Sequence, residues 1–152
     1  MPNRTDILQE IKTVIAGIPG LVGVYVYPDE YDAIPANAEP VAIVEELRAI
    51  ANSTSVIASG CAISNWQASI LIIVARGIAQ YPSKETAVND ILAGNFEQLA
   101  VTALLGASLP DSVLVADMVS SNSWFQWEKS GGDHEPVWAV RVLVPIAQEI
   151  YF

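Results

Sequence analysis

Residues 66–77 read Trp-Gln-Ala-Ser-Ile-Leu-Ile-Ile-Val-Ala-Arg-Gly. From Trp66 to Ile70, large apolar residues alternate with smaller or polar ones, which is the period of a β-strand. Leu71 to Val74 are then continuously apolar, as is typical of a central strand that is buried on both faces. We therefore expect residues 66–77 to lie in the middle of a sheet, with the remaining elements arranged around it.

The residues before this strand predict a helix, a strand and a loop. In residues 5–18 the apolar side chains recur at helical spacing, and Asp6 with Gln9 resembles a capping box, with Thr5 as the alternative cap. Residues 21–27 alternate valine with glycine and tyrosine, which indicates a strand. Residues 28–40 hold three prolines and four acids and are expected to form a loop.

Two stretches between this loop and residue 66 are ambiguous between strand and helix. Val41 to Val44 favour a strand, whereas Glu45 to Ile50 favour a helix, and the preceding proline together with the β-branched start favours a strand for residues 40–50. Residues 54–63 are interrupted by Ser59 and Gly60. We expect them to form one weak strand.

The residues after the central strand predict a helical region followed by strands. Ser83 suits an N-cap, residues 84–105 are expected to be helical with a break or bend at Gly94 and Asn95, and Gly106 suits the end of the helix. Residues 112–120, 123–129 and 137–146 predict strands, with a turn at residues 130–133. Pro145 suggests that this last strand ends on a sheet edge or at a bulge.

The strands therefore come in groups rather than alternating singly with helices. This order predicts an α+β fold with a mainly antiparallel β-sheet, and with the N-terminal helix and the central helical segment packed on one face. The length of 152 residues fits a single domain, 1–152.

The composition combines many apolar residues with few charges. The chain is 52% hydrophobic and 16% charged, with 7 basic and 17 acidic residues and a net charge of −10. Because average domains carry about 25% charged residues, this shortage suggests that part of the surface is covered by a partner. The hydrophobicity excludes a disordered chain, and the acidity argues against a protein that holds nucleic acid through basic contacts.

Motifs for catalysis, cofactors and metals are missing from the sequence. It lacks a nucleophile elbow, a phosphate-binding loop and a dinucleotide fingerprint, and one cysteine with one histidine makes zinc implausible. Cys61 is expected to be a small buried apolar residue, and His134 an exposed residue of a turn. We expect no cofactor and no transmembrane helix, because the uncharged stretch 49–75 is interspersed with polar residues.

An aromatic cluster near the C-terminus is the most informative feature for function. Trp124, Phe125 and Trp127 precede the predicted turn, and Trp138 follows it. They either pack across one hairpin or anchor a protein partner, since tryptophan and arginine dominate interface hot spots. Arg76 and Arg141 lie in apolar strands and are either paired interface arginines or strand-end residues that reach solvent.

The order of these elements resembles that of the tail terminator (tail completion) and neck proteins of long-tailed bacteriophages. The resemblance rests on the helix at 7–18, the strands at 22–27, 40–45 and 66–74, the central helical segment and the closing strand at 137–144. It implies a structural virion protein without enzymatic activity, assembled in the host cytoplasm. Such proteins form a ring, usually a hexamer, that caps the tail tube, stops its growth and joins the tail to the head connector.

The acidic charge is compatible with a ring through which DNA passes, because like charge repels phosphate. We expect some of five acids to face the lumen: Asp29, Glu30, Asp32, Glu45 and Glu46. Glu45 and Glu46 are neighbours on a predicted strand, so they should point to opposite faces and are expected to be solvated. The alternatives are another phage neck or tail-assembly component, such as a head-completion or tube protein, or a small α+β enzyme or ligand-binding domain.

Overall fold

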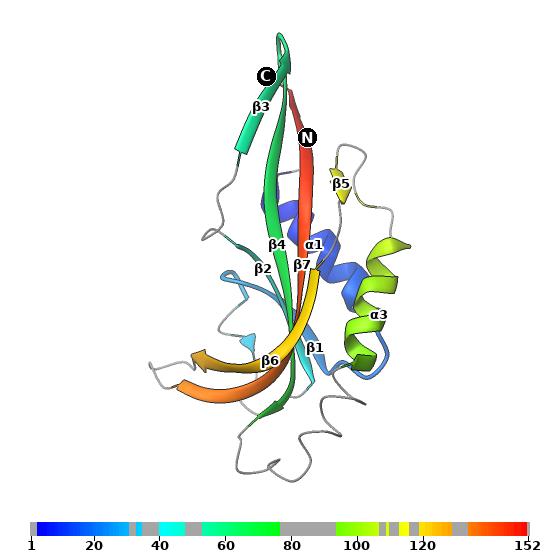
Figure 1. Ribbon diagram of the computed structural model, residues 1–152, viewed down its shortest axis with the longest axis vertical. Helices are drawn as coiled ribbons and strands as arrows, with labels where there is room; N and C mark the ends of the chain where they lie inside the picture. The colour runs from blue at the N-terminus through cyan, green and yellow to red at the C-terminus, as the bar shows by residue number, and fades with distance from the viewer. Residues whose placement is uncertain are drawn as a thin grey trace.

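The centre of the sheet is the long antiparallel pair of β4 (Cys61–Arg76) and β7 (His134–Tyr151), which is visible in Figure 1. The computed structural model describes residues 3–30, 33–34, 40–47, 53–76, 94–106, 109, 113–115, 119–128 and 134–151. The other elements within these residues are α1 (Arg4–Ile15), β1 (Gly23–Val26), β2 (Val41–Glu46), β3 (Ser53–Ala58), α3 (Gly94–Leu105), β5 (Val113–Val115) and β6 (Val119–Glu128).

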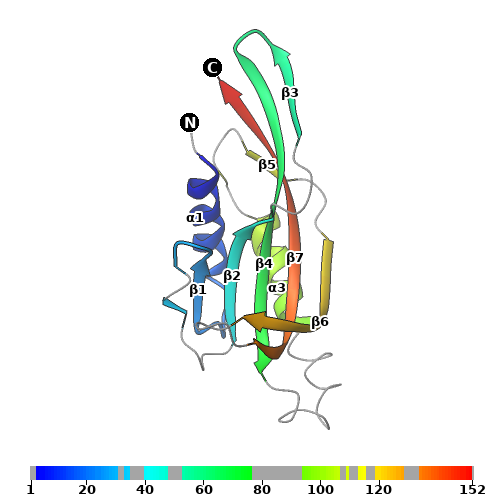
Figure 2. The same cartoon turned by 90° about the vertical axis from the view of Figure 1, so that its left-hand side faces the viewer.

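These strands form one mostly antiparallel sheet. The order is β1-β2-β4-β7-β5, with β3 pairing β4 beyond the end of β2, and β6 pairing the other end of β7. Only β1 and β2 run parallel among the described pairs. Figure 2 shows β6 bending across the face of the sheet that the helices do not cover. The α+β fold with a mainly antiparallel sheet is confirmed.

Both helices pack on the same face of the sheet. The fully buried stripe of α1, formed by Ile7, Ile11 and Ile15, and the buried residues Ala100 and Leu104 of α3 share one core with the sheet. The sheet supplies to this core the side chains of Ala42, Val44, Ile70, Ile72, Val140, Val142 and Val144. A second cluster lies on the opposite face and contains Val41, Ile43, Leu71, Ile73 and Ala139. The expected burial of the central strand on both faces is therefore confirmed.

The stretch 54–63 is a hairpin rather than the single weak strand that we expected. β3 pairs with the start of β4, and the chain reverses at Ser59 and Gly60, where Gly60 has a φ of 81° that favours glycine. The central strand therefore begins at Cys61, five residues before Trp66. The ambiguous stretch 40–50 contains a strand, β2, as expected from its β-branched residues.

The start of α1 differs from the expected cap. Asn3 is the N-cap, because its side chain accepts a hydrogen bond from Asp6 N (2.8 Å) while Asp6 Oδ2 accepts one from Asn3 N (3.1 Å). Asp6 is thus the third helical residue and closes the capping box, rather than opening one with Gln9. The helix begins at Arg4 and ends at Ile15.

β7 runs through Pro145 and does not end there. Gln67 O accepts a hydrogen bond from Leu47 N (3.0 Å), so the backbone groups of Gln67 point toward β2 and away from Pro145, its register partner on β7. Pro145 lies between Leu143, which pairs with β6, and Ile146, which pairs with β5. The lack of a backbone N–H at Pro145 therefore removes no hydrogen bond between the described strands of the sheet.

The boundaries of α3, β5 and β6 agree only in part with those expected from the sequence. α3 begins at Gly94, the expected break, and ends at Leu105 with Gly106 N bonded to Thr102 O (3.1 Å). The rest of the predicted helical region and the turn at 130–133 lie outside the described residues. The predicted strands 112–120 and 123–129 are divided differently, as a short β5 and a continuous ten-residue β6.

Candidate functional site

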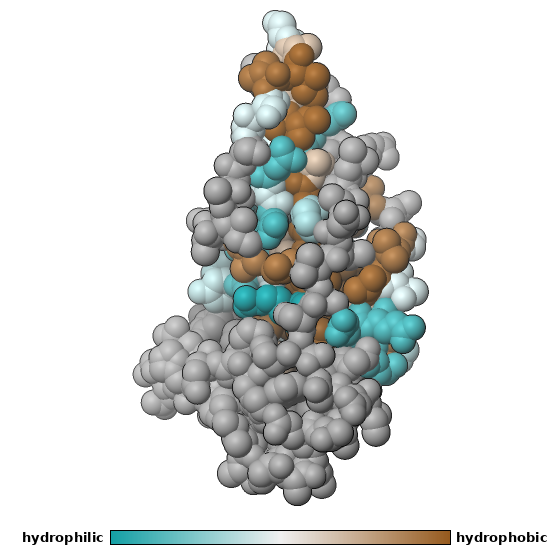
Figure 3. All heavy atoms as spheres, viewed as in Figure 1, coloured by the Kyte–Doolittle hydropathy of each residue, from teal (hydrophilic) through white to brown (hydrophobic). Residues whose placement is uncertain are grey.

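The hairpin formed by β3 and the first residues of β4 projects beyond the helices, as both ribbon views show (Figure 1, Figure 2). We call residues 53–65 the arm. The arm contains no charged residue. Val56 is 69% exposed and Ile57 is 58% exposed, and Figure 3 shows hydrophobic side chains gathered at this end of the molecule. Soluble proteins seldom leave such a projection uncovered, which makes the arm the leading candidate for an interaction site.

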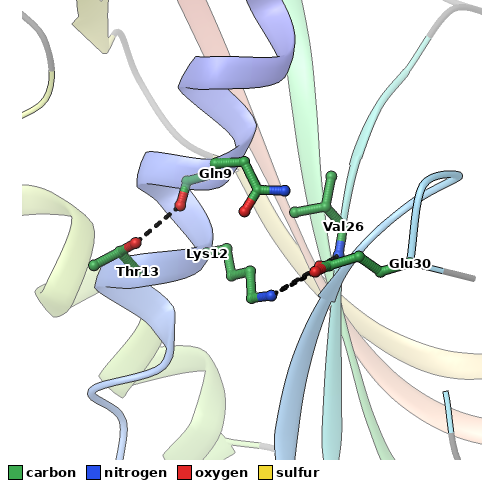
Figure 4. Close-up of polar contacts among 5 residues, drawn as sticks. All are labelled: Gln9, Lys12, Thr13, Val26 and Glu30. Atoms are coloured by element: carbon green, nitrogen blue, oxygen red, sulfur yellow. Dashed lines mark hydrogen bonds and ion pairs between the residues drawn. The ribbon is translucent and has the colours of Figure 1, made fainter. Parts of the chain in front are cut away.

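At Val26, the outer edge of β1 is closed by the chain itself. Val26 N donates to Glu30 Oε1 (2.7 Å), and Glu30 N donates to Val26 O (2.8 Å). Lys12 Nζ on α1 holds the same carboxylate at 2.7 and 2.9 Å, as Figure 4 shows. The hydrogen bond from Lys12 lowers the pKa of Glu30, and the hydrogen bond from the Val26 backbone adds to this effect. The edge at Val26 is therefore not available to a further strand.

A groove of about 450 Å³ lies between the start of α1 and the end of β1. The Arg4 guanidinium at its rim bonds to Glu46, donates to Ser64 Oγ (3.3 Å) and lies 5.3 Å from the centre of the Trp66 ring. Trp66 Nε1 in turn donates to Gln148 Oε1 (3.3 Å). Because these interactions already occupy Arg4, the groove offers a ligand no uncommitted basic group among its lining residues.

Glu45 and Arg141 meet on the sheet face opposite the helices. Arg141 Nη2 lies 3.9 Å from Glu45 Oε1, reaching from β7 across β4 to β2. Burial raises the pKa of Glu45, and the charge of Arg141 partly opposes this shift. Near this pair, Ser69 Oγ and Gln67 Oε1 are buried, and neither has a hydrogen-bond partner among the described residues. The pair makes this face partly polar beside its apolar cluster.

The structure separates the five predicted lumen acids. Glu45 and Glu46 point to opposite faces as expected, but the expectation that they are solvated is wrong, because both are half-buried and ion-paired within the chain. Glu30 is paired with Lys12, Asp29 is exposed, and Asp32 lies outside the described residues. Three of these acids are therefore partly neutralised by intrachain cations.

The aromatic cluster lies on the β6–β7 hairpin. The register places Trp124 directly opposite Trp138, Phe125 opposite Val137, and Trp127 opposite Glu135. Arg76 is the last residue of β4 and pairs in register with Val137. The side chains of these interface candidates lie outside the described part of the structure, and Arg141 is the candidate whose partner, Glu45, is seen.

The two residues considered for reactivity also have defined backbone positions. Cys61 begins β4 and is half-buried rather than fully buried, because it lies in the arm, beyond the helices. His134 begins β7, opposite Glu128 in β6, so it belongs to a strand rather than to the turn. Among the described residues, no group of three or more potential metal ligands comes together.

No protein-family model matches the chain, and no curated protein matches it. Within the described part of the chain, neither helix is long and apolar enough to cross a membrane. The candidate site therefore rests on the geometry of the arm and the sheet edges.

Sequence reasoning missed the arm and the closed edge of β1. The signal for the arm was present in the pair Ser59–Gly60, which separates two uncharged stretches, of which the first is rich in β-branched residues. The contact between Val26 and Glu30 spans four residues around Pro28 and has no residue-type signature of its own.

Proposed function

We propose that this protein is a structural component of a bacteriophage virion, a tail terminator or neck protein that forms a ring on the tail tube. In this proposal the ring stops tube growth and joins the tail to the head connector. It assembles in the host cytoplasm, and DNA passes through it without specific binding. The observation that carries the proposal is the uncharged arm with exposed Val56 and Ile57.

The arm supports self-assembly because of where the charges lie. The chain has a net charge of −10, so two copies repel each other through most of their surface. The arm itself has no charge and extends beyond the helices, and Glu149 of β7, which pairs in register with Ile63, is a charged residue beside it. Contact through the arm therefore keeps most of the acidic surface of two copies apart. At physiological salt, repulsion between charges is screened beyond about 8 Å. The stretch of β4 from Cys61 to Gln67 lies beyond its pairing with β2, and at about 3.3 Å per residue it is longer than this screening distance. Contact at the arm can therefore form without strong repulsion between the two acidic bodies.

The placement of the acids refines the proposed lumen. Glu30, Glu45 and Glu46 have cationic partners in the chain, whereas Asp29 is exposed. We therefore assign Asp29 the greater part in repelling DNA phosphates, with the paired acids contributing less. The alternative is that the chain is a head-completion protein or a tube protein, which would use the same arm. The experiment below distinguishes this alternative from the proposed function.

Electron microscopy of the purified protein mixed with tail tubes tests this function. We expect rings at one end of each tube and an arrest of tube elongation, and light scattering should give a hexamer or a monomer that assembles on tubes. Binding along the tube wall, or binding to head portals without tubes, would favour the alternatives. A protein that stays monomeric and never associates with tubes contradicts the proposal.

A further inference from the structure

The strands at the sheet edges differ in whether a further strand can pair with them. Val26 in β1 already exchanges two hydrogen bonds with Glu30, donating to its carboxylate and accepting from its backbone N–H. In contrast, β3 pairs with β4 alone, and β6 pairs with β7 alone, among the described strands. β3 has no charge, and the only charge in β6 is Glu128 at its end. Apart from Glu128, both strands therefore lack the charged side chains and prolines that usually protect an edge.

The register shows which backbone groups face outward on β3. Gln67 points its backbone groups toward the side of β4 on which β2 and β3 lie, because its carbonyl accepts from Leu47 N. Because the direction of the backbone groups alternates along an antiparallel strand, those of Asn65 and Ile63 also point to this side. They bond to their register partners on β3, which are Ser53 and Ser55. The N–H and C=O groups of Thr54 and Val56 consequently lie on the outer edge of β3.

The same alternation applies across β7 to β6. The backbone hydrogen-bonding groups of the odd-numbered residues of β7, Pro145 among them, point away from β4. The backbones of Arg141 and Ala139 therefore bond to those of their register partners, Ser121 and Ser123. The outward-facing groups of β6 are then those of the even-numbered residues from Ser120 to Gln126. β6 thus offers a longer open edge than β3.

We propose that β3 of one copy pairs antiparallel with β6 of the next copy, extending the sheet from subunit to subunit. This inference rests on the proposed ring and names its subunit contact. β3 and β6 lie on opposite sides and at opposite ends of the central pair β4–β7. β3 runs antiparallel to β4, which runs antiparallel to β7, which runs antiparallel to β6. Copies with similarly oriented sheets therefore bring β3 and β6 together as antiparallel neighbours.

A ring requires a contact between two different edges. Such a head-to-tail contact can repeat from copy to copy, whereas a contact between two identical edges stops at a dimer. The diagonal offset between β3 and β6 corresponds to the stagger that tilted strands need when a sheet closes on itself. The partner is a second copy rather than a basic protein, because β3 has no charge and Glu128 is the single charge of β6, which is little to attract a basic partner.

Cysteine pairs at positions facing away from the new ladder bonds test the contact. Ser55 on β3 and Ser121 or Ser123 on β6 would form pairs without mutual hydrogen bonds, where the Cα atoms lie about 4.5 Å apart, within disulfide range. We would combine S55C with S121C or with S123C, to cover two registers, in a C61A background. The single variants and the pair S55C/E10C are controls, since Glu10 is an exposed residue of α1.

Mild oxidation of one of the two double variants should give a ladder of covalent oligomers up to the ring size, while the single variants and the α1 control stay monomeric. As an independent readout, T54P removes an outward N–H and no bond to β4, so it should fold and lose assembly at least 10-fold. Dimers from S55C alone, or rings in which neither pair cross-links, overturn the β3–β6 contact and leave the proposed function standing. Ladders from a protein that never caps tubes support the contact and contradict the function.

Discussion

Glu30 closes the outer edge of β1 by exchanging two hydrogen bonds with Val26, one through its carboxylate (2.7 Å) and one through its backbone N–H (2.8 Å). Lys12 fixes the same carboxylate from the helix layer. A single side chain thus joins the helix layer to the sheet and occupies an edge that would otherwise accept another strand.

The first prediction concerns this edge. We expect Glu30→Ala to lower the free energy of unfolding by about 1–2 kcal/mol, because Val26 N and Lys12 both lose their acceptor. The variant should also aggregate at lower concentration, since the edge of β1 is opened. Urea titration and light scattering measure the two effects. Glu10→Ala, at an exposed position of α1, is the control, and equal behaviour of the two variants would contradict the assigned role of Glu30.

The second prediction is a difference in pH dependence between two glutamates. The pKa of Glu30 is lowered from the ordinary value of 4.5, so its charge stabilises the fold above about pH 4.5 and this contribution is lost as the pH falls through the folded pKa. Because the side chains of Glu30 and Lys12 are both 29% exposed, solvent screening reduces this contribution, and Glu30→Gln should cost less than about 1 kcal/mol at pH 7 and progressively less below pH 4.5.

The effect of Glu45 on stability should change with pH in the opposite direction. Its pKa is raised from 4.5 by burial, so ionisation costs stability as the pH rises from 4.5 through the folded pKa. We expect Glu45→Gln to leave the unfolding free energy at pH 7 unchanged or to raise it by about 1 kcal/mol, because the amide still accepts from Arg141. Urea midpoints of both variants between pH 3 and pH 8 test the pair, and parallel curves would show that the assigned environments are wrong.

The third prediction compares two buried serines on β4. Ser69 is fully buried and its Oγ has no hydrogen-bond partner among the described residues, whereas Ser64 is 3% exposed and accepts from Arg4. Ser69→Ala should raise the unfolding free energy by about 1 kcal/mol by removing an unsatisfied hydroxyl.

Ser64→Ala should lower the unfolding free energy by a similar amount, about 1 kcal/mol, because it removes one of the two acceptors of Arg4, the other being Glu46. Thermal and urea unfolding of the two variants provide the comparison. A loss of stability in both would mean that the Ser69 hydroxyl is satisfied in solution.

The fourth prediction separates assembly from folding. Ile57→Asp places a charge on the arm and should lower self-association at least 10-fold, because the carboxylate would have to be desolvated in the contact. Leu105→Asp is the matched control, since Leu105 is 74% exposed on α3, away from the arm. We expect both variants to unfold within about 0.5 kcal/mol of the parent protein. Light scattering that finds both equally impaired would argue against the arm as the contact.

Much of the architecture could be read from local patterns. The apolar period of residues 7–15 predicted α1, and Ile70 to Ile73 predicted a strand buried on both faces, because periodicity reports directly which side chains leave water. The boundaries were less predictable. The sequence suggested Asp6 or Thr5 as the helix cap, and only the bonds between Asn3 and Asp6 show that Asn3 is the cap.

The candidate site depended on the fold to a greater degree. The acids at positions 29–32 and 45–46 were chosen by charge alone, and the structure pairs Glu30, Glu45 and Glu46 with three different cations from two elements, α1 and β7. Such pairs join residues up to 96 positions apart, as Glu45 and Arg141 show. Sequence spacing carries no information about contacts of this kind.

The sequence by itself determined the class of fold, the acidic charge and the absence of charge from residues 49 to 75, because these follow from residue types and their local period. The tertiary structure alone decided that this uncharged stretch divides into a central strand and a projecting arm. It also decided that Val26 on the edge of β1 is bonded within the chain, whereas β3 and β6 each pair with a single strand among the described ones. An edge is defined by what lies beside a strand, and strand neighbours are set by long-range pairing rather than by local propensity.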